Sequence, residues 1–370
     1  MMANPIRVLQ VVSKMNRGGA ETMIMNLYRN IDRSKVQFDF IVHSKEKCAY
    51  DDEIESLGGK IYKVPQYIGK NHIQYIKAWE DFFQMHHEYK IIHGHVRSTA
   101  VLYLRIAKKY GLTTIAHSHS TSSGVGFIAI MKNIFQYPIR YTADYFFACS
   151  KAAGEWLYGK KVCNSSNFHI IYNAIDFKSF IFNENKRTKA RKEFGVEDKL
   201  VIGHVGRFHS SKNHEFIIDI FKEVHEINEE TKLLLIGDGK LRETIENKVS
   251  RLALKDSVIF AGIRTDVSYL LQAMDIYVFP SLFEGFPVTL IEAQAAGLTC
   301  IISDTITKEV CITPLVIQLP LSLSAKEWAE IILKQNIQRV NTKLYFEHTE
   351  FDINNLVEKL TEFYIRISKD

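Results

Sequence analysis

Apolar, strand-like runs alternate with helical stretches along the whole chain. In the first half these runs cover residues 6–12, 38–43, 91–95, 113–118, 145–150 and 169–173, and in the second half 200–206, 232–238, 258–262, 276–281 and 299–304. Such alternation predicts the α/β class, with parallel sheets covered by helices on both faces. A chain of 370 residues exceeds the size that one core usually supports. We therefore predict two Rossmann-like, doubly wound domains, joined between residues 174 and 199.

The composition excludes several classes of protein. The formal net charge of +5 is mild and spread out, which predicts no nucleic-acid partner but suits an anionic substrate or an anionic membrane surface. The five cysteines form no C-x-x-C pair, and several lie in apolar strands, as reduced thiols do. The sequence has neither a signal-peptide pattern nor an apolar run of about 18 residues, so we expect a cytoplasmic protein.

Two glutamates follow the apolar run IYVF (276–279). Glu284 heads an EGFP turn, and Glu292 lies in the helical segment VTLIEAQAAG, about two turns into the expected helix. Ligands of doubly wound sheets bind beyond the carboxyl ends of strands, and backbone N–H groups at Phe286, Val288 and Thr289 would favour an anion there. Carboxylates beside an anion site suit a ligand with hydroxyls. A nucleotide-sugar offers both a diphosphate and hydroxyls.

Two further loops come directly after predicted strands. Arg207 and Lys212 follow the strand at 200–206, and both cations could converge on one anion. Gly18 and Gly19 follow the first strand, where glycine lets the backbone approach a ligand closely before a helix begins near Ala20. The sequence has no G-x-G-x-x-G, which is against a nicotinamide-dependent dehydrogenase.

These motifs resemble a known family. E-x7-E headed by EGFP, together with R-x4-K after an earlier strand, is similar to the donor-site signature of retaining glycosyltransferases of the GT-B fold, family four, of the type that builds bacterial exopolysaccharide or capsule. The resemblance covers essentially the whole chain and is most specific in the second half. It implies two domains facing a central cleft, with an acceptor-side domain at 1–175 and a donor domain at 176–350. A C-terminal helix at 351–370 would cross back to the first domain.

The resemblance also implies roles for individual residues on the donor side. Arg207 and Lys212 would bind the donor diphosphate, Glu284 the sugar hydroxyls and Glu292 the ribose hydroxyls. Ile263 and Arg264 would meet the nucleotide base. The rest of the donor-binding set implied by the family is Gly18, Gly19, Gly285, Phe286, Pro287, Val288 and Thr289.

A histidine at the end of the strand at 113–118 would lie beside the anomeric carbon in the resembled family. His117 is the better match, but the sequence H-S-H-S leaves His119 open as the alternative. The implied catalytic set is therefore His117, Arg207, Lys212 and Glu284, with Glu21, His95 and His119 as acceptor-side candidates. We expect no metal or other cofactor, because the cations neutralise the leaving group and no cluster has zinc-ligand spacing.

The expected reaction moves a sugar from a nucleoside diphosphate, by default UDP, to a hydroxyl of a glycan or lipid-linked saccharide. Two alternatives stay open, a sugar-nucleotide epimerase of the same fold and a non-catalytic nucleotide-binding partner subunit. The apolar, aromatic and basic stretch at 127–147 is either a helix in peripheral contact with a membrane or a core helix with solvated lysines. The sequence does not fix the acceptor or the oligomeric state.

Overall fold

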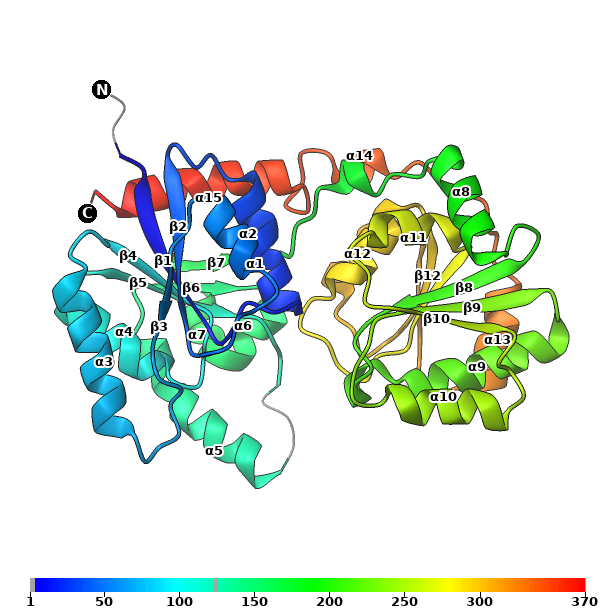
Figure 1. Cartoon of the computed structure of the whole chain (residues 1–370), viewed down its shortest axis with the longest axis horizontal. Coiled ribbons are helices and arrows are strands. Elements are labelled where there is room, and N and C mark those ends of the chain that lie inside the picture. Colours follow the sequence, from blue (N-terminus) through cyan, green and yellow to red (C-terminus); the bar gives the residue numbers. More distant parts are fainter. Residues whose placement is uncertain (1–3, 123–125, 370) are drawn as a thin grey trace. The chain divides into compact units, whose positions relative to one another are not determined.

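The computed structural model describes residues 4–122 and 126–369, with the side chains of 127–129 left out. The chain forms two compact units. The first runs to Ala174 and resumes at Glu350, and the second is Ile175–Thr349. Each unit is a parallel sheet with helices on both faces (Figure 1), which confirms the predicted α/β class and the two Rossmann-like domains.

The described part of the first unit holds a seven-stranded sheet in the order β3-β2-β1-β4-β5-β6-β7, and all its strand pairs are parallel. The strands are β1 (Ile6–Val12), β2 (Val36–Val42), β3 (Ile61–Lys63), β4 (Ile91–Gly94), β5 (Thr113–Ser118), β6 (Tyr145–Ala148) and β7 (Phe168–Ile170). The helices are α1 (Gly19–Asn30), α2 (Asp51–Ser56), α3 (His72–Met85), α4 (Ala100–Lys109), α5 (Phe127–Gln136), α6 (Lys151–Tyr158), α7 (Lys160–Cys163) and α15 (Ile353–Ile367).

The second unit holds a six-stranded parallel sheet in the order β10-β9-β8-β11-β12-β13. Its strands are β8 (Leu200–Val205), β9 (Thr231–Ile236), β10 (Val258–Gly262), β11 (Ile276–Phe279), β12 (Thr299–Ser303) and β13 (Val316–Leu319). Its helices are α8 (Glu184–Phe194), α9 (His214–Ile227), α10 (Arg242–Arg251), α11 (Val267–Ala273), α12 (Val288–Ala295), α13 (Ala325–Leu333) and α14 (Lys343–Phe346). Helices α9, α10 and α13 lie along one face of this sheet (Figure 1).

Two strands at sheet edges, β3 and β13, were not predicted from the sequence. They are only three and four residues long, and most of their side chains are half-buried rather than buried. Such short runs lack the continuous apolar pattern that marks a central parallel strand.

The last helix, α15, belongs to the first unit and packs on α1, β1 and β2. The Asp352 side chain accepts a hydrogen bond from the Asn354 N–H and so begins the helix. Its apolar residues recur at helical spacing and are buried in the core of the first unit: Ile353, Leu356, Val357, Leu360, Phe363, Tyr364 and Ile367. The helix therefore crosses back to the first domain, as predicted.

No helix among the residues that the structure describes is both long and apolar enough to span a bilayer.

Candidate active site

A half-buried ion pair lies at the carboxyl edge of the second sheet. The Lys212 Nζ atom is 2.7 Å from Glu284 Oε1, and the two side chains are 18% and 13% exposed. Lys212 follows β8 and Glu284 follows the neighbouring strand β11, so the parallel pairing of these strands brings the two predicted residues together. The Lys212 ammonium also lies over the Phe279 ring, 4.7 Å from its centroid.

The two loops that carry this pair are tied to each other by hydrogen bonds. The Leu282 N–H donates to the Ser211 carbonyl at 2.8 Å, and the Asn213 side-chain amide donates to the Pro280 carbonyl at 3.1 Å. Asn213 has a φ of 56°, a left-handed conformation that asparagine tolerates better than most residues. The position of Lys212 relative to Glu284 is therefore set by backbone contacts as well as by their charges.

Glycine shapes the loop that begins at Gly206. A Cβ atom at Gly237 would lie 2.2 Å from the Gly206 carbonyl oxygen, and Gly237 has a φ of +133°. The turn after β9 thus packs directly on the backbone that leads to Arg207. The Arg207 side chain is exposed.

Helix α12 starts at Val288, with Pro287 as its N-cap residue. This start agrees with the predicted helical segment VTLIEAQAAG. Glu292 lies four residues after Val288 and so just over one turn into the helix, and our expectation of about two turns is wrong. Phe286, Pro287 and Val288 are buried, whereas Gly285 and Thr289 are half-buried. The Thr289 hydroxyl lies 3.1 Å from that of Tyr277.

The carboxyl group of Glu292 is poorly solvated, and burial raises its pKa to about 7. Glu292 thus changes its protonation state near neutral pH.

The predicted base-binding residues follow β10. Ile263 is 64% exposed, so its side chain can still gain contacts by covering an apolar ring. Arg264 donates to Asp266 at 2.8 Å and 2.6 Å and lies 3.3 Å from Glu193. These acidic partners fix the plane of the guanidinium group.

In the first unit, the glycine loop follows β1, and Gly18 is the N-cap residue of α1. A Cβ atom at Gly19 would meet nothing within 4 Å, so packing inside the protein does not require glycine there. That open space is compatible with close approach of a ligand. Glu21 lies in the first turn of α1 and is half-buried.

Four histidines gather where β4 and β5 end: His93, His95, His117 and His119. Their rings stack, with centroids 4.1 Å apart for His117 and His119 and 4.3 Å apart for His93 and His95. His93 Nε2 lies 3.1 Å from His117 Nδ1, and His95 Nδ1 lies 2.7 Å from His119 Nε2. Burial lowers the pKa of each imidazole, to about 3 for His93 and His119, so all four are neutral at physiological pH.

The spacing of histidines in the sequence did not reveal this cluster, because it depends on the register between β4 and β5. Ring nitrogens of His93, His95 and His117 lie within 4.8 Å of one another and could together hold a metal ion. Both ring nitrogens of His93 and of His95 already make hydrogen bonds, including one from His95 Nε2 to Gln10 at 2.8 Å. A metal would have to replace these bonds.

Both halves of the chain match glycosyltransferase families. Residues 185–319 match the family described as "Glycosyl transferases group 1" and residues 17–179 the one described as "Glycosyltransferase Family 4". EpsF of Bacillus subtilis (strain 168), which is named as a glycosyltransferase, is 38% identical over 340 residues, covering 90% of this chain and 88% of EpsF. The chain belongs to glycosyltransferase family 4.

Other relatives and a solved structure extend the comparison of this glycosyltransferase. The capsular polysaccharide biosynthesis glycosyltransferase CapH of Staphylococcus aureus is 25% identical over 389 residues, covering 97% of this chain and 99% of CapH. An Escherichia coli galactosyltransferase is 26% identical over 228 residues, which cover 59% of this chain and 58% of that enzyme. Its name gives UDP-Gal as the donor and alpha-D-GlcNAc-diphosphoundecaprenol as the acceptor. The crystal structure of Anabaena HepE in complex with UDP-glucose has a TM-score of 0.74 at 17% identity, covering 98% of this chain and 97% of that chain. The glycosyltransferase therefore has the GT-B fold.

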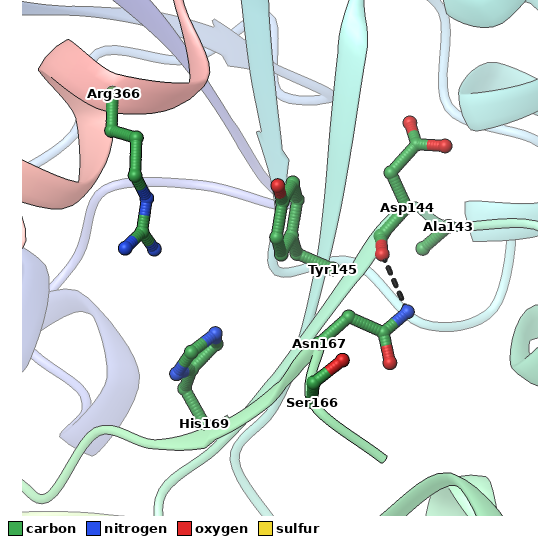
Figure 2. Close-up of a pocket in the computed structure, with 7 residues that line it drawn as sticks. All are labelled: Ala143, Asp144, Tyr145, Ser166, Asn167, His169 and Arg366. Carbon is green, nitrogen blue, oxygen red and sulfur yellow. Dashed lines mark hydrogen bonds between the residues drawn. The ribbon is translucent and has the colours of Figure 1, made fainter. Parts of the chain in front are cut away.

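A pocket of about 610 Å³ lies at the amino ends of strands of the first sheet, whereas the histidine cluster lies at the carboxyl ends (Figure 2). It is lined by Ala143, Asp144, Tyr145, Ser166, Asn167, His169 and Arg366. Tyr145 begins β6, and His169 lies in the short strand β7, so the pocket is at the amino ends of these strands. The Asn167 amide donates to the Asp144 carbonyl at 2.7 Å across one side of it. Since ligands of such sheets bind at the carboxyl ends, we assign this pocket no part in glycosyl transfer.

Glu292→Gln is expected to raise the free energy of unfolding at about pH 8 by up to roughly 3 kcal/mol, measured by urea denaturation. The folded carboxyl keeps its proton up to a pKa of about 7, whereas its ordinary value is 4.5. The stability of the wild type therefore falls as the pH rises between these values, and the gain should shrink to under about 1 kcal/mol at pH 5.

The exposed Glu229→Gln in the same unit is the matched control and should change stability at neither pH. An equal gain for Glu292→Gln at both pH values would show that the raised pKa is not the cause.

Proposed function

We propose that this glycosyltransferase moves a sugar from UDP to a hydroxyl of a glycan or lipid-linked saccharide in cell-surface polysaccharide synthesis, with retention of the anomeric configuration. The observation that carries the proposal is the Lys212–Glu284 pair at the carboxyl edge of β8 and β11. A cation for a diphosphate and a carboxylate for sugar hydroxyls are held side by side there, close to the start of α12 in sequence.

Each charged residue then has a part in the reaction. Arg207, Lys212 and the first N–H groups of α12 stabilise the departing diphosphate. Glu284 holds hydroxyls of the donor sugar, and Glu292 holds those of the ribose. Because these cations neutralise the leaving group, the reaction needs no divalent metal.

The relatives support the choice of donor and acceptor. The E. coli galactosyltransferase is named for a UDP-linked sugar, an acceptor on a lipid diphosphate and an alpha-1,3 linkage, and HepE was solved with UDP-glucose. CapH is named for capsular polysaccharide biosynthesis. Retention follows the family resemblance, with a leaving phosphate oxygen on the same face of the sugar taking the proton of the acceptor hydroxyl.

Transfer from a panel of UDP-sugars to undecaprenyl-diphosphate saccharides, in the presence of EDTA, tests this proposal. We expect one UDP-sugar to give a product whose new linkage is alpha by NMR. Lys212→Ala should mainly lower kcat, because it removes a charge that stabilises the leaving group, and Glu292→Ala should mainly raise the KM for the donor.

The melting temperature of each variant separates loss of function from loss of folding. Unchanged kinetics in both variants would contradict the assignment of the donor residues. Formation of a new sugar-nucleotide from the donor alone would instead indicate the epimerase alternative.

We also propose peripheral contact with a membrane through α5 and the 3-10 helix Tyr137–Tyr141. Large apolar side chains are exposed on this segment: Ile130, Ile134, Phe135, Tyr137 and Tyr141. Lys132 is exposed beside them, and the Arg140 guanidinium lies 3.8 Å from the centroid of the Tyr137 ring. This exposure is against the core-helix alternative. Exposed apolar and basic side chains together suit an anionic lipid surface, where a lipid-linked acceptor would be met.

The double variant Ile134→Glu/Phe135→Glu should lose most co-sedimentation with vesicles that contain anionic lipid, because it places charge where apolar side chains would enter the bilayer. Ile73→Glu, a change at an even more exposed isoleucine of α3, is the control and should bind vesicles as the wild type does. Equal loss of binding in both variants would contradict a specific role for this segment.

A further inference from the structure

Tyr364 connects the C-terminal helix to the histidine cluster. It is fully buried on α15 and packs edge-on against Phe38, with ring centroids 6.0 Å apart. Its hydroxyl lies 2.7 Å from His93 Nδ1. A residue near the end of the chain thus reaches the carboxyl edge of the first sheet.

The chemistry of the buried groups gives these hydrogen bonds a direction. The amide oxygen of Gln10 can only accept, and it lies 2.8 Å from His95 Nε2, so His95 carries its proton on that nitrogen. Tyr364 is fully buried, and a buried O–H group needs an acceptor. His93 Nδ1 lies within hydrogen-bond distance of this hydroxyl, so the Tyr364 O–H donates to it.

The same reasoning continues through the two histidines that follow. A neutral imidazole carries one proton, so His93 must carry it on Nε2, from which it donates to His117 Nδ1 at 3.1 Å. His117 in turn must carry its proton on Nε2. This nitrogen is buried and has no hydrogen-bond partner among the described residues, although buried N–H groups are nearly always paired.

We propose that Tyr364 is a positioning residue that acts through His93 to fix His117 as a hydrogen-bond donor at Nε2. The inference rests on the proposed glycosyl transfer, in which an oxygen of a bound substrate would accept this bond. In this tautomer His117 cannot take a proton at Nε2, so it binds substrate and does not serve as a general base. Donation in the opposite direction, from His93 Nδ1 to the Tyr364 oxygen, would leave an acceptor at His117 Nε2, which makes the assignment testable.

Imidazole ¹⁵N NMR of the ligand-free protein at neutral pH reads the tautomer directly. The His117 signals are assigned by their loss in His117→Gln. In the wild type we expect a protonated Nε2 and an unprotonated Nδ1 in His117. Tyr364→Phe keeps the ring but removes the hydroxyl, so the His93 and His117 signals should shift toward mixed tautomers.

Tyr28→Phe is the matched control. Tyr28 is a fully buried tyrosine of the same core that donates to the Leu57 carbonyl and accepts from Gln37. It should leave both histidines unchanged. A protonated Nδ1 in wild-type His117, unchanged His117 signals in Tyr364→Phe, or stoichiometric metal bound at His93 and His117 would each overturn the proposal.

Enzyme activity gives a second test of Tyr364. A residue with a purely structural role would not change kcat/KM while leaving UDP binding intact. Tyr364→Phe should lower kcat/KM about tenfold or less, while thermal stabilisation by UDP, which depends on residues of the second unit, stays at the wild-type value. A wild type that shows the expected tautomer but neither binds UDP nor transfers sugar would contradict the proposed function while leaving the tautomer assignment intact.

Discussion

Parallel strand pairing is the constraint on which the rest of this protein depends. All strand pairs in the described parts of both sheets run in the same direction. The loops that follow the strands of a sheet therefore meet at one edge, whatever their separation in the sequence. Lys212 and Glu284 are 72 positions apart by their numbering, yet they form one ion pair because β8 and β11 are neighbours. His93 and His117 meet for the same reason at the ends of β4 and β5.

The groups at these edges are held by contacts that do not take part in the chemistry. In the second unit, Asn213 and Ser211 tie one loop to the other through Pro280 and Leu282, so the charged side chains begin from fixed backbone positions. In the first unit, α15 places a tyrosine hydroxyl against a histidine. Helix α15 thus contributes apolar side chains to the core and one polar contact, the Tyr364 hydroxyl. This contact explains why the buried face of α15 is not wholly apolar.

The sequence was most informative about site residues that can be recognised from the segment following a single strand. Most central strands could be predicted from continuous apolar runs, and Glu284 and Lys212 could be singled out because each lies in the loop after such a run. The short edge strands β3 and β13 lack this pattern. The histidine cluster could not be foreseen, since it needs the register of β4 against β5 and a partner, Tyr364, 271 positions from His93. The start of α12 at Val288 agrees with the predicted helical segment VTLIEAQAAG, and only the number of turns between this start and Glu292 was overestimated. The roles of the individual site residues stay predictions.

The central claim is that the Lys212–Glu284 pair recognises a UDP-sugar, with Lys212 for the diphosphate and Glu284 for the sugar. The most direct test is calorimetric titration of UDP and of the UDP-sugar that supports transfer, into the wild type, Glu284→Gln and Lys212→Met. We predict that Glu284→Gln weakens binding of the UDP-sugar by about tenfold and leaves UDP binding nearly unchanged, because a hydrogen bond to a charged group is lost only with the sugar. Lys212→Met should weaken binding of UDP more than binding of the UDP-sugar, because free UDP carries the charge of the departed leaving group. Equal affinities of all three proteins for both ligands, or an equal loss of UDP and UDP-sugar binding in Glu284→Gln, would contradict the account.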